Sequence, residues 1–237
     1  MRHFSVMRSK IFIDGLLLAK WQKKFELKFD WGSKIPAVLA GIYSLSLLAE
    51  EVESEYYIAQ QELIINQNPS LKMDFSLSSE IISEREFDKF SYLKLKSTVS
   101  FKDNTLLILN SKLIRTKNQK LKNSQNQNSK KELNLKRSFS WRTFSKQEIE
   151  SFADLSGDLN SIHLKSDPVV QGMLILLTFE DFLAQRNRFA QKIKIKYFRP
   201  SRAGESIYLN EIDDNRFLGL VDDKINFKIT IKENLNV

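Results

Sequence analysis

The chain has no cysteine and only two histidines among its 237 residues. The missing cysteines exclude a disulfide framework, a thiolate metal site and a cysteine nucleophile. With so few suitable ligands we expect no metal ion, and no motif indicates a cofactor. No segment reaches the roughly twenty apolar residues that a membrane-spanning helix needs. The first twenty residues lack a signal-peptide cleavage site after their apolar run, so we expect a cytoplasmic protein without a membrane span.

Basic residues outnumber acidic ones, and the formal net charge is +8. Such a balance fits three kinds of partner: nucleic acid, an anionic membrane surface, or an acidic ligand or carrier. Along the sequence the charge is dispersed, with no basic stripe interleaved with aromatic residues, no zinc knuckle and no RNA-recognition motif. We therefore expect no nucleic-acid partner, and a lysine-rich solvated surface is the simplest interpretation.

A polar, Asn- and Lys-rich run without apolar periodicity occupies residues 117–137. Its composition is typical of a linker, because it offers too little apolar surface to bury. We therefore predict two units, residues 1–116 and residues 138–237.

Both units share one plan: an almost entirely apolar helix followed by alternating strands. Such helices belong inside a protein, wrapped by a sheet. In the second unit, Ser145 and Glu148 form a capping box that opens a further helix through 150–155. The pattern predicts an α+β double hotdog, with two antiparallel sheets each wrapping a central helix. The expected apolar helices are 37–49 and 169–179, preceded by Pro36 and Pro168, and the expected strands are 71–77, 92–101, 106–113, 192–198, 205–212, 216–221 and 225–231.

Residues 156–163 (SGDLNSIH) form the most informative stretch of the chain. Asp158 and His163 could there be aimed at one small molecule, and histidine can exchange a proton near neutral pH. The alternative is a loop in which Asp158 and Asn160 cap a turn while His163 only packs. The short pattern leaves both interpretations open.

Three segments in this order resemble the MaoC-like dehydratases, which include the R-specific enoyl-CoA hydratases: residues 152–163, the sequence Gln171-Gly172-Met173-Leu174, and Phe198-Arg199-Pro200 with Gly204. The resemblance covers about residues 141–232. Residues 1–116 are similar only in plan to the degenerate N-terminal hotdog of double-hotdog members. The resemblance implies reversible syn addition of water to a trans-2-enoyl thioester, which gives a (3R)-3-hydroxyacyl thioester.

By motif position, the resemblance implies that Asp158 and His163 hold the reacting water and move its protons. The backbone N–H of Gly172, at a helix N-terminus, would meet the thioester oxygen as enolate charge develops. Asn160, Gln171 and Met173 are expected to contact the substrate, although Met173 also suits the core. The implied partner is an acyl-CoA or an acyl carrier protein thioester, and a homodimer of double hotdogs is possible.

Three features depart from the family pattern. Ser161 replaces a proline, Gln171 replaces a histidine, and only residues 164–170 separate His163 from Gln171. A non-catalytic double hotdog that binds acyl thioesters or a protein partner is therefore the main alternative. A thioesterase is a third hypothesis. It ranks last because residues 168–179 contain no carboxylate.

Overall fold

The computed structural model describes residues 6–49, 51–52, 56–116 and 138–233, and the predicted linker 117–137 lies outside them. The helices are α1 (Gly15–Phe25), α2 (Ala37–Ser46), α3 (Lys146–Ser156) and α4 (Gly172–Ala184), with a 3-10 turn at Ser161–His163. The strands are β1 (Met7–Phe12), β2 (Tyr57–Ile65), β3 (Asp74–Glu86), β4 (Phe90–Phe101), β5 (Asn104–Thr116), β6 (Ser138–Thr143), β7 (Ala190–Tyr197), β8 (Ser206–Asp213), β9 (Arg216–Val221) and β10 (Lys224–Glu233).

The strands of the described residues form one antiparallel sheet of ten, in the order β1-β3-β4-β5-β2-β7-β10-β9-β8-β6. The expectation of two separate sheets was therefore wrong, while the α+β class is confirmed. The reason is β2, which sequence analysis missed. It pairs with β5 on one side and with β7 on the other, from Gln60 opposite Lys196 to Ile64 opposite Lys192. Neither half is left with an open strand edge at their junction.

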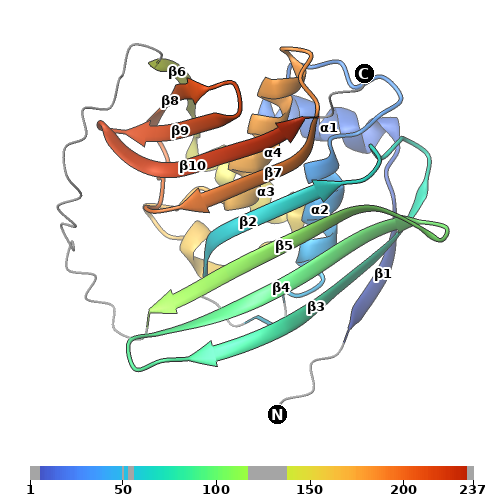
Figure 1. Ribbon diagram of the computed structural model, residues 1–237, viewed down its shortest axis with the longest axis horizontal. Coiled ribbons are helices and arrows are strands. Elements are labelled where there is room, and N and C mark those ends of the chain that lie inside the picture. The colour runs from blue at the N-terminus through green and yellow to red at the C-terminus, as the bar shows by residue number, and fades with distance from the viewer. Residues whose placement is uncertain (1–5, 50, 53–55, 117–137, 234–237) are drawn as a thin grey trace.

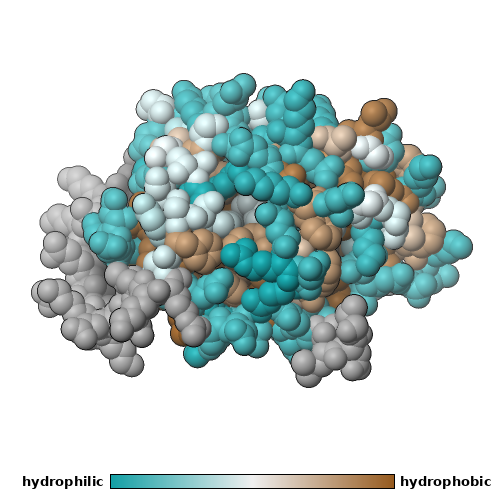
Figure 2. Space-filling view, turned by 90° about the horizontal axis from the view of Figure 1, so that it is seen from above, coloured by the Kyte–Doolittle hydropathy of each residue, from teal (hydrophilic) through white to brown (hydrophobic). Residues whose placement is uncertain are grey.

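The helices lie on one face of the sheet, behind the strands as seen in Figure 1. Both α2 and α4 are buried along almost their whole length, as their apolar composition predicts. Seen from above, hydrophilic side chains cover most of the surface and hydrophobic ones appear between them in separate groups (Figure 2). None of the helices in the described residues is long and apolar enough to span a bilayer.

Helix α4 begins and ends later than the sequence suggested. Val169 and Val170 precede it in extended backbone, because Val170 N–H donates to Ser201 O (2.8 Å) and Val169 forms a β-bridge with Arg202. At its other end the helix continues past residue 179 to Ala184 and includes two buried carboxylates. The thioesterase was ranked last because the predicted helix contained no carboxylate. The helix does contain carboxylates, so that reason does not hold.

The two carboxylates of α4 bind backbone amides of the N-terminal half. Glu180 accepts from the N–H groups of Ala37 and Val38, both at 2.9 Å, and so caps α2 from outside that helix. Burial raises the pKa of Glu180 to about 7. Asp181 accepts from the N–H groups of Lys28 (2.9 Å) and Phe29 (3.1 Å). These bonds fasten α4 to both α1 and α2.

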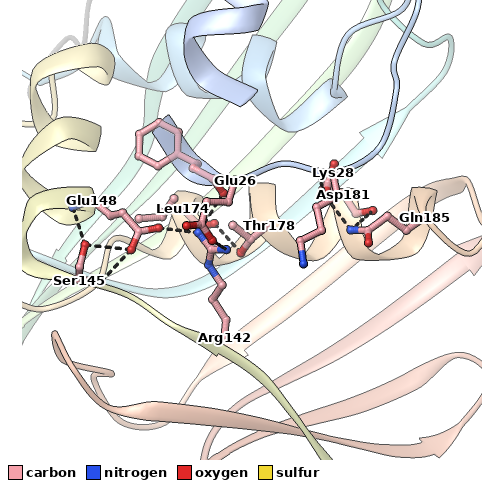
Figure 3. A network of polar contacts seen from close by, with 10 residues as sticks. Glu26, Lys28, Arg142, Ser145, Glu148, Leu174, Thr178, Asp181 and Gln185 are labelled. Atoms are coloured by element: carbon pink, nitrogen blue, oxygen red, sulfur yellow. Dashed lines mark hydrogen bonds and ion pairs between the residues drawn. The ribbon is translucent and has the colours of Figure 1, made fainter. Parts of the chain in front are cut away.

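A second polar junction joins α1 to β6 and α3. Arg142 on β6 lies between Glu26 (3.0 Å) and Glu148 (2.5 Å), and it also donates to the carbonyl of Phe25 (2.9 Å). Figure 3 shows this cluster beside Asp181 of α4. The capping box predicted at the start of α3 is present, so Glu148 both caps its own helix and holds Arg142.

Candidate active site

The loop that carries the predicted catalytic pair begins where α3 ends. Gly157 has a φ of 72°, in the left-handed region that glycine adopts without steric cost, and its N–H donates to Ala153 O at 2.9 Å. The hydroxyl of Ser156 donates to Phe152 O (2.6 Å) and accepts from the N–H of Asp158 (3.2 Å). This C-cap turns the chain sharply and fixes the start of the loop.

Asp158 and Asn160 each bond to backbone two residues ahead. Asp158 Oδ1 accepts from Asn160 N–H, and Asn160 Oδ1 accepts from Ile162 N–H, both at 3.3 Å. Asn160 also donates through Nδ2 to Tyr56 O at 2.7 Å, which joins the loop to the N-terminal half. The capping alternative therefore holds for both side chains, and it does not exclude a chemical role for Asp158.

The structure brings Asp158 and His163 together. His163 Nε2 lies 3.5 Å from Asp158 Oδ2; the imidazole is buried and the carboxylate side chain is 35% exposed. His163 Nδ1 lies 2.7 Å from the carbonyl oxygen of Val169, which can only accept, so Nδ1 carries a proton. In neutral His163 the lone pair is therefore on Nε2, facing Asp158. The short 164–170 segment supplies the group that orients the imidazole.

Gly172 is the first residue of α4 and lies against β7 and β2. Its carbonyl accepts from the hydroxyl of Tyr197 at 2.8 Å. A Cβ at this position would lie 3.0 Å from Tyr197 Oη, 3.1 Å from Tyr197 Cζ and 3.4 Å from Ile58 Cδ1. A Cβ here would crowd the ring of Tyr197, so close packing by itself favours glycine at this position.

A cavity of about 580 Å³ extends from these residues between the two halves of the chain. The wall from the C-terminal half includes the polar groups Asp158, Asn160, His163 and Gly172. The wall from the N-terminal half is mainly apolar and comes from α2 and the strands beside it, including Leu45, Leu48, Leu95 and Leu113. A ligand with a polar head and an apolar tail fits this distribution.

Of the predicted substrate contacts, Asn160 and Met173 line the cavity and Gln171 does not. Gln171 is buried and donates through Nε2 to Ile149 O at 2.9 Å, and its Oε1 has no hydrogen-bond partner among the described residues. Met173 forms part of the wall, with its sulfur accepting from Gln61 Nε2. Gln171 therefore links the start of α4 to α3 and does not line the cavity.

Sequence reasoning missed Tyr197 and Gln61, which lie behind Gly172. Tyr197 donates to Gly172 O and lies 3.4 Å from Gln61 Oε1. Burial raises the pKa of Tyr197 well above its ordinary value, so the hydroxyl remains a donor. Its inward position, in step with Ile193 and Ile195, was a signal for Tyr197, and Gln61 had none because β2 was not predicted.

Positive charge also lines the cavity. Arg199 and Arg202 both line it; Arg199 is exposed, and Arg202 is paired with Asp167 at 2.6 Å.

Within the described ranges, no three Asp, Glu or His side chains are grouped as ligands for a metal ion.

No protein-family model and no curated protein matches the sequence, but solved structures do. HtdX from Mycobacterium tuberculosis has a TM-score of 0.73 at 11% identity, covering 98% of this chain and 100% of that one. A MaoC-like dehydratase from Phytophthora capsici has a TM-score of 0.63 at 12% identity, covering 98% and 96%. An acyl-ACP thioesterase from Bacteroides thetaiotaomicron has a TM-score of 0.61 at 10% identity, covering 97% and 98%. Identities this low establish the fold alone: the chain has the hotdog-type fold of the MaoC-like dehydratases.

Proposed function

We propose that the protein is an (R)-specific hydratase or dehydratase of acyl thioesters, with Asp158, His163 and Gly172 as its catalytic groups. The observation that carries the proposal is the 3.5 Å approach of His163 Nε2 to Asp158 Oδ2 in the wall of a mainly apolar cavity. A hydration needs one water held by a base and a second polar group, beside the α,β-double bond of a substrate whose tail is apolar.

In the hydration direction, the water lies between the carboxylate of Asp158 and the Nε2 lone pair of His163. His163 takes a proton while the water oxygen bonds to C3 of the enoyl group, and the π electrons move to the thioester oxygen. The N–H of Gly172 stabilises this enolate, helped by the positive end of the α4 dipole. The imidazolium then returns the proton to C2 on the same face, which gives syn addition and leaves the enzyme unchanged.

The cavity supports a substrate class. Its apolar wall suits an acyl chain, and the exposed Arg199 on its lining suits the phosphates of CoA or of a carrier-bound pantetheine arm. We assign the substrate as a 2-enoyl or 3-hydroxyacyl thioester of CoA or acyl carrier protein. We interpret residues 1–116 as a degenerate N-terminal hotdog and residues 138–237 as the catalytic hotdog. The N-terminal unit would then bind the tail of a substrate whose head reacts in the other unit.

Two alternatives are kept because specific observations favour them. Similarity in structure to an acyl-ACP thioesterase extends over the whole chain, and α4 does contain carboxylates. Glu180 and Asp181, however, are each bound to two backbone amides and neither lines the cavity. A non-catalytic protein that binds acyl thioesters would use the same cavity, so only an activity measurement separates it from the enzyme.

The test is hydration of crotonyl-CoA and longer trans-2-enoyl-CoAs, followed by loss of absorbance of the conjugated thioester. We expect Asp158→Asn and His163→Ala each to lower kcat by about 10²-fold or more, the scale of a lost general acid or base. Asp154→Asn, which changes an exposed carboxylate on α3, is the matched control. Full activity in both site variants would refute the assignment. Tight binding of enoyl-CoA without turnover by the unmodified protein would favour the binding protein.

A further inference from the structure

Many lysine side chains lie on the outer face of the sheet. Side chains on β4, β7 and β10 alternate between the buried inner face and the solvent, and Figure 1 looks onto the solvent side, with α2, α3 and α4 behind it. Eight lysines occupy outward positions of these strands and one outward position of β5: Lys94, Lys96, Lys112, Lys192, Lys194, Lys196, Lys228 and Lys232. We call this set the lysine face. Residues that are dispersed along the sequence are gathered on one surface by the strand order.

The pairing register places like charges directly opposite one another. Lys94 faces Lys112, Lys196 faces Lys228, and Lys192 faces Lys232. Side chains directly opposite on neighbouring strands have Cβ atoms about 4.5–5.5 Å apart, and like charges in this position destabilise a sheet. Binding of anions would relieve this repulsion, so the arrangement favours an anionic partner.

Few carboxylates offset the charge. Glu62 on β2 lies 2.9 Å from Lys192 and 3.9 Å from Lys194, and Glu80 on β3 is opposite Lys96. The other lysines of the face have no carboxylate among the described residues within ion-pair distance. The row Lys94, Lys112, Gln60, Lys196 and Lys228 therefore crosses five adjacent strands, about 19 Å at the usual strand spacing, without an acidic residue.

We propose that the lysine face binds the surface of a lipid bilayer rich in anionic headgroups. The cations are all lysine, whose compact ammonium is attracted to mobile headgroups without needing a partner of fixed geometry. Nucleic-acid and phosphate sites of fixed geometry favour the planar fork of arginine together with stacking aromatic rings. The lysine face has these groups at its β3–β4 end, where Tyr92 lies opposite Arg85, whereas the row from Lys112 through Gln60 and Lys196 to Lys228 contains neither. An acidic protein would need apolar or aromatic anchors, and lysine is depleted from such interfaces.

The binding is peripheral and electrostatic, because the charge of the lysine face is concentrated in opposed lysine pairs; single apolar side chains such as Ile64, opposite Lys192, lie among them. It should weaken as salt shortens the Debye length from about 10 Å at 0.1 M towards about 3 Å at 1 M. Each lysine near such a surface contributes about fivefold to partitioning. The inference does not depend on the chemistry proposed for the cavity, which lies on the other face of the sheet.

The test is cosedimentation of the full chain with phosphatidylcholine vesicles, with and without about 30 mol% phosphatidylglycerol. The sodium chloride concentration is varied over about 0.05–0.5 M, a range over which the Debye length shortens. We expect binding to the anionic vesicles only, with loss at high salt. The variant Lys94→Gln, Lys112→Gln, Lys196→Gln, Lys228→Gln should bind at least 50-fold more weakly. The control Lys20→Gln, Lys23→Gln, Lys24→Gln, Lys28→Gln makes the same charge change at exposed positions on and after α1 and should lose less than fivefold.

Thermal melts of both variants establish that they fold; the face variant should melt no lower than the unmodified chain, since it removes like-charge pairs. Equal losses in the face and control variants would overturn the proposal in favour of a general effect of net charge. Absence of binding to anionic vesicles at low salt would also overturn it. Duplex DNA or an acidic protein binding through the same four lysines, with vesicles not bound, would replace the bilayer by that partner.

Discussion

Glu180 should make the stability of this protein fall as the pH rises from acid towards neutrality. Its carboxyl is buried beneath the N-terminus of α2, where it accepts from Ala37 and Val38, and its neighbour Asp181 adds a second negative charge. Loss of hydration outweighs the two hydrogen bonds, so burial raises the pKa from 4.5 to about 7. The proton is held more tightly in the folded chain than in the unfolded one.

The sign and size of the effect follow from linkage. Below pH 4.5 the carboxyl is protonated in both states, and above pH 7 it is ionised in both. Between these values the unfolded chain binds fewer protons, so the free energy of unfolding decreases with rising pH. A pKa difference of this size is worth about 3 kcal/mol in total. For a chain of this length that corresponds to roughly 6–12 °C in Tm.

Urea unfolding at half-unit steps from pH 4.5 to pH 8 measures the effect. Glu180→Gln keeps the shape of the side chain and removes the titration, so its stability should be nearly flat over this window. Glu150→Gln removes an exposed carboxylate of α3 and should follow the unmodified protein. Stability that is constant or increases with pH in the unmodified protein, or an unchanged slope in Glu180→Gln, would show that the carboxyl is not desolvated as described.

Two further predictions concern the packing behind the catalytic loop. Tyr197→Phe removes the bond to Gly172 O and should lower kcat for enoyl-thioester hydration about tenfold with little change in KM, since the start of α4 loses its alignment. Steady-state kinetics beside the exposed control Tyr208→Phe measures this, and an unchanged kcat would contradict a positioning role. Gly172→Ala places a methyl group 3.0 Å from Tyr197 Oη and should destabilise the fold by about 1–3 kcal/mol in urea unfolding. Gly15→Ala, where a Cβ meets nothing within 4 Å, should cost far less, and equal costs would refute the steric argument.

Local signals predicted the features that depend on neighbouring residues. The capping box at Ser145 and Glu148 gave the start of α3, and continuous apolar composition gave α2 and most of α4. Alternation gave β4, β5 and the four strands from β7 to β10, whereas β6 was not predicted. The approach of Asp158 to His163 was also predicted, because both belong to one short loop.

Long-range contacts could not be predicted in the same way. From the sequence, Glu180 and Asp181 suggest the solvent-exposed polar end of an apolar helix. Both side chains are in fact buried, because backbone amides more than 140 residues earlier in the chain donate hydrogen bonds to them. Asp14 interrupts an apolar run in the sequence, yet it caps α1 by accepting from Leu17 N–H at 2.8 Å. The positions of Leu18, Trp21 and Phe25 on one side of that helix were an unused signal. The lysine face depends on strand order and register, which alternation alone does not fix.

The pairing of β2 with β7 has a consequence for any attempt to move the proposed catalytic loop to another protein. A fragment restricted to residues 138–237 would expose the whole edge of β7, where unpaired amides and carbonyls invite self-association. The same excision would remove the backbone groups that Glu180 and Asp181 bind, leaving two carboxylates in an apolar interior. The half that bears the motif is therefore not expected to fold as a separate module, because its sheet continues into the N-terminal half.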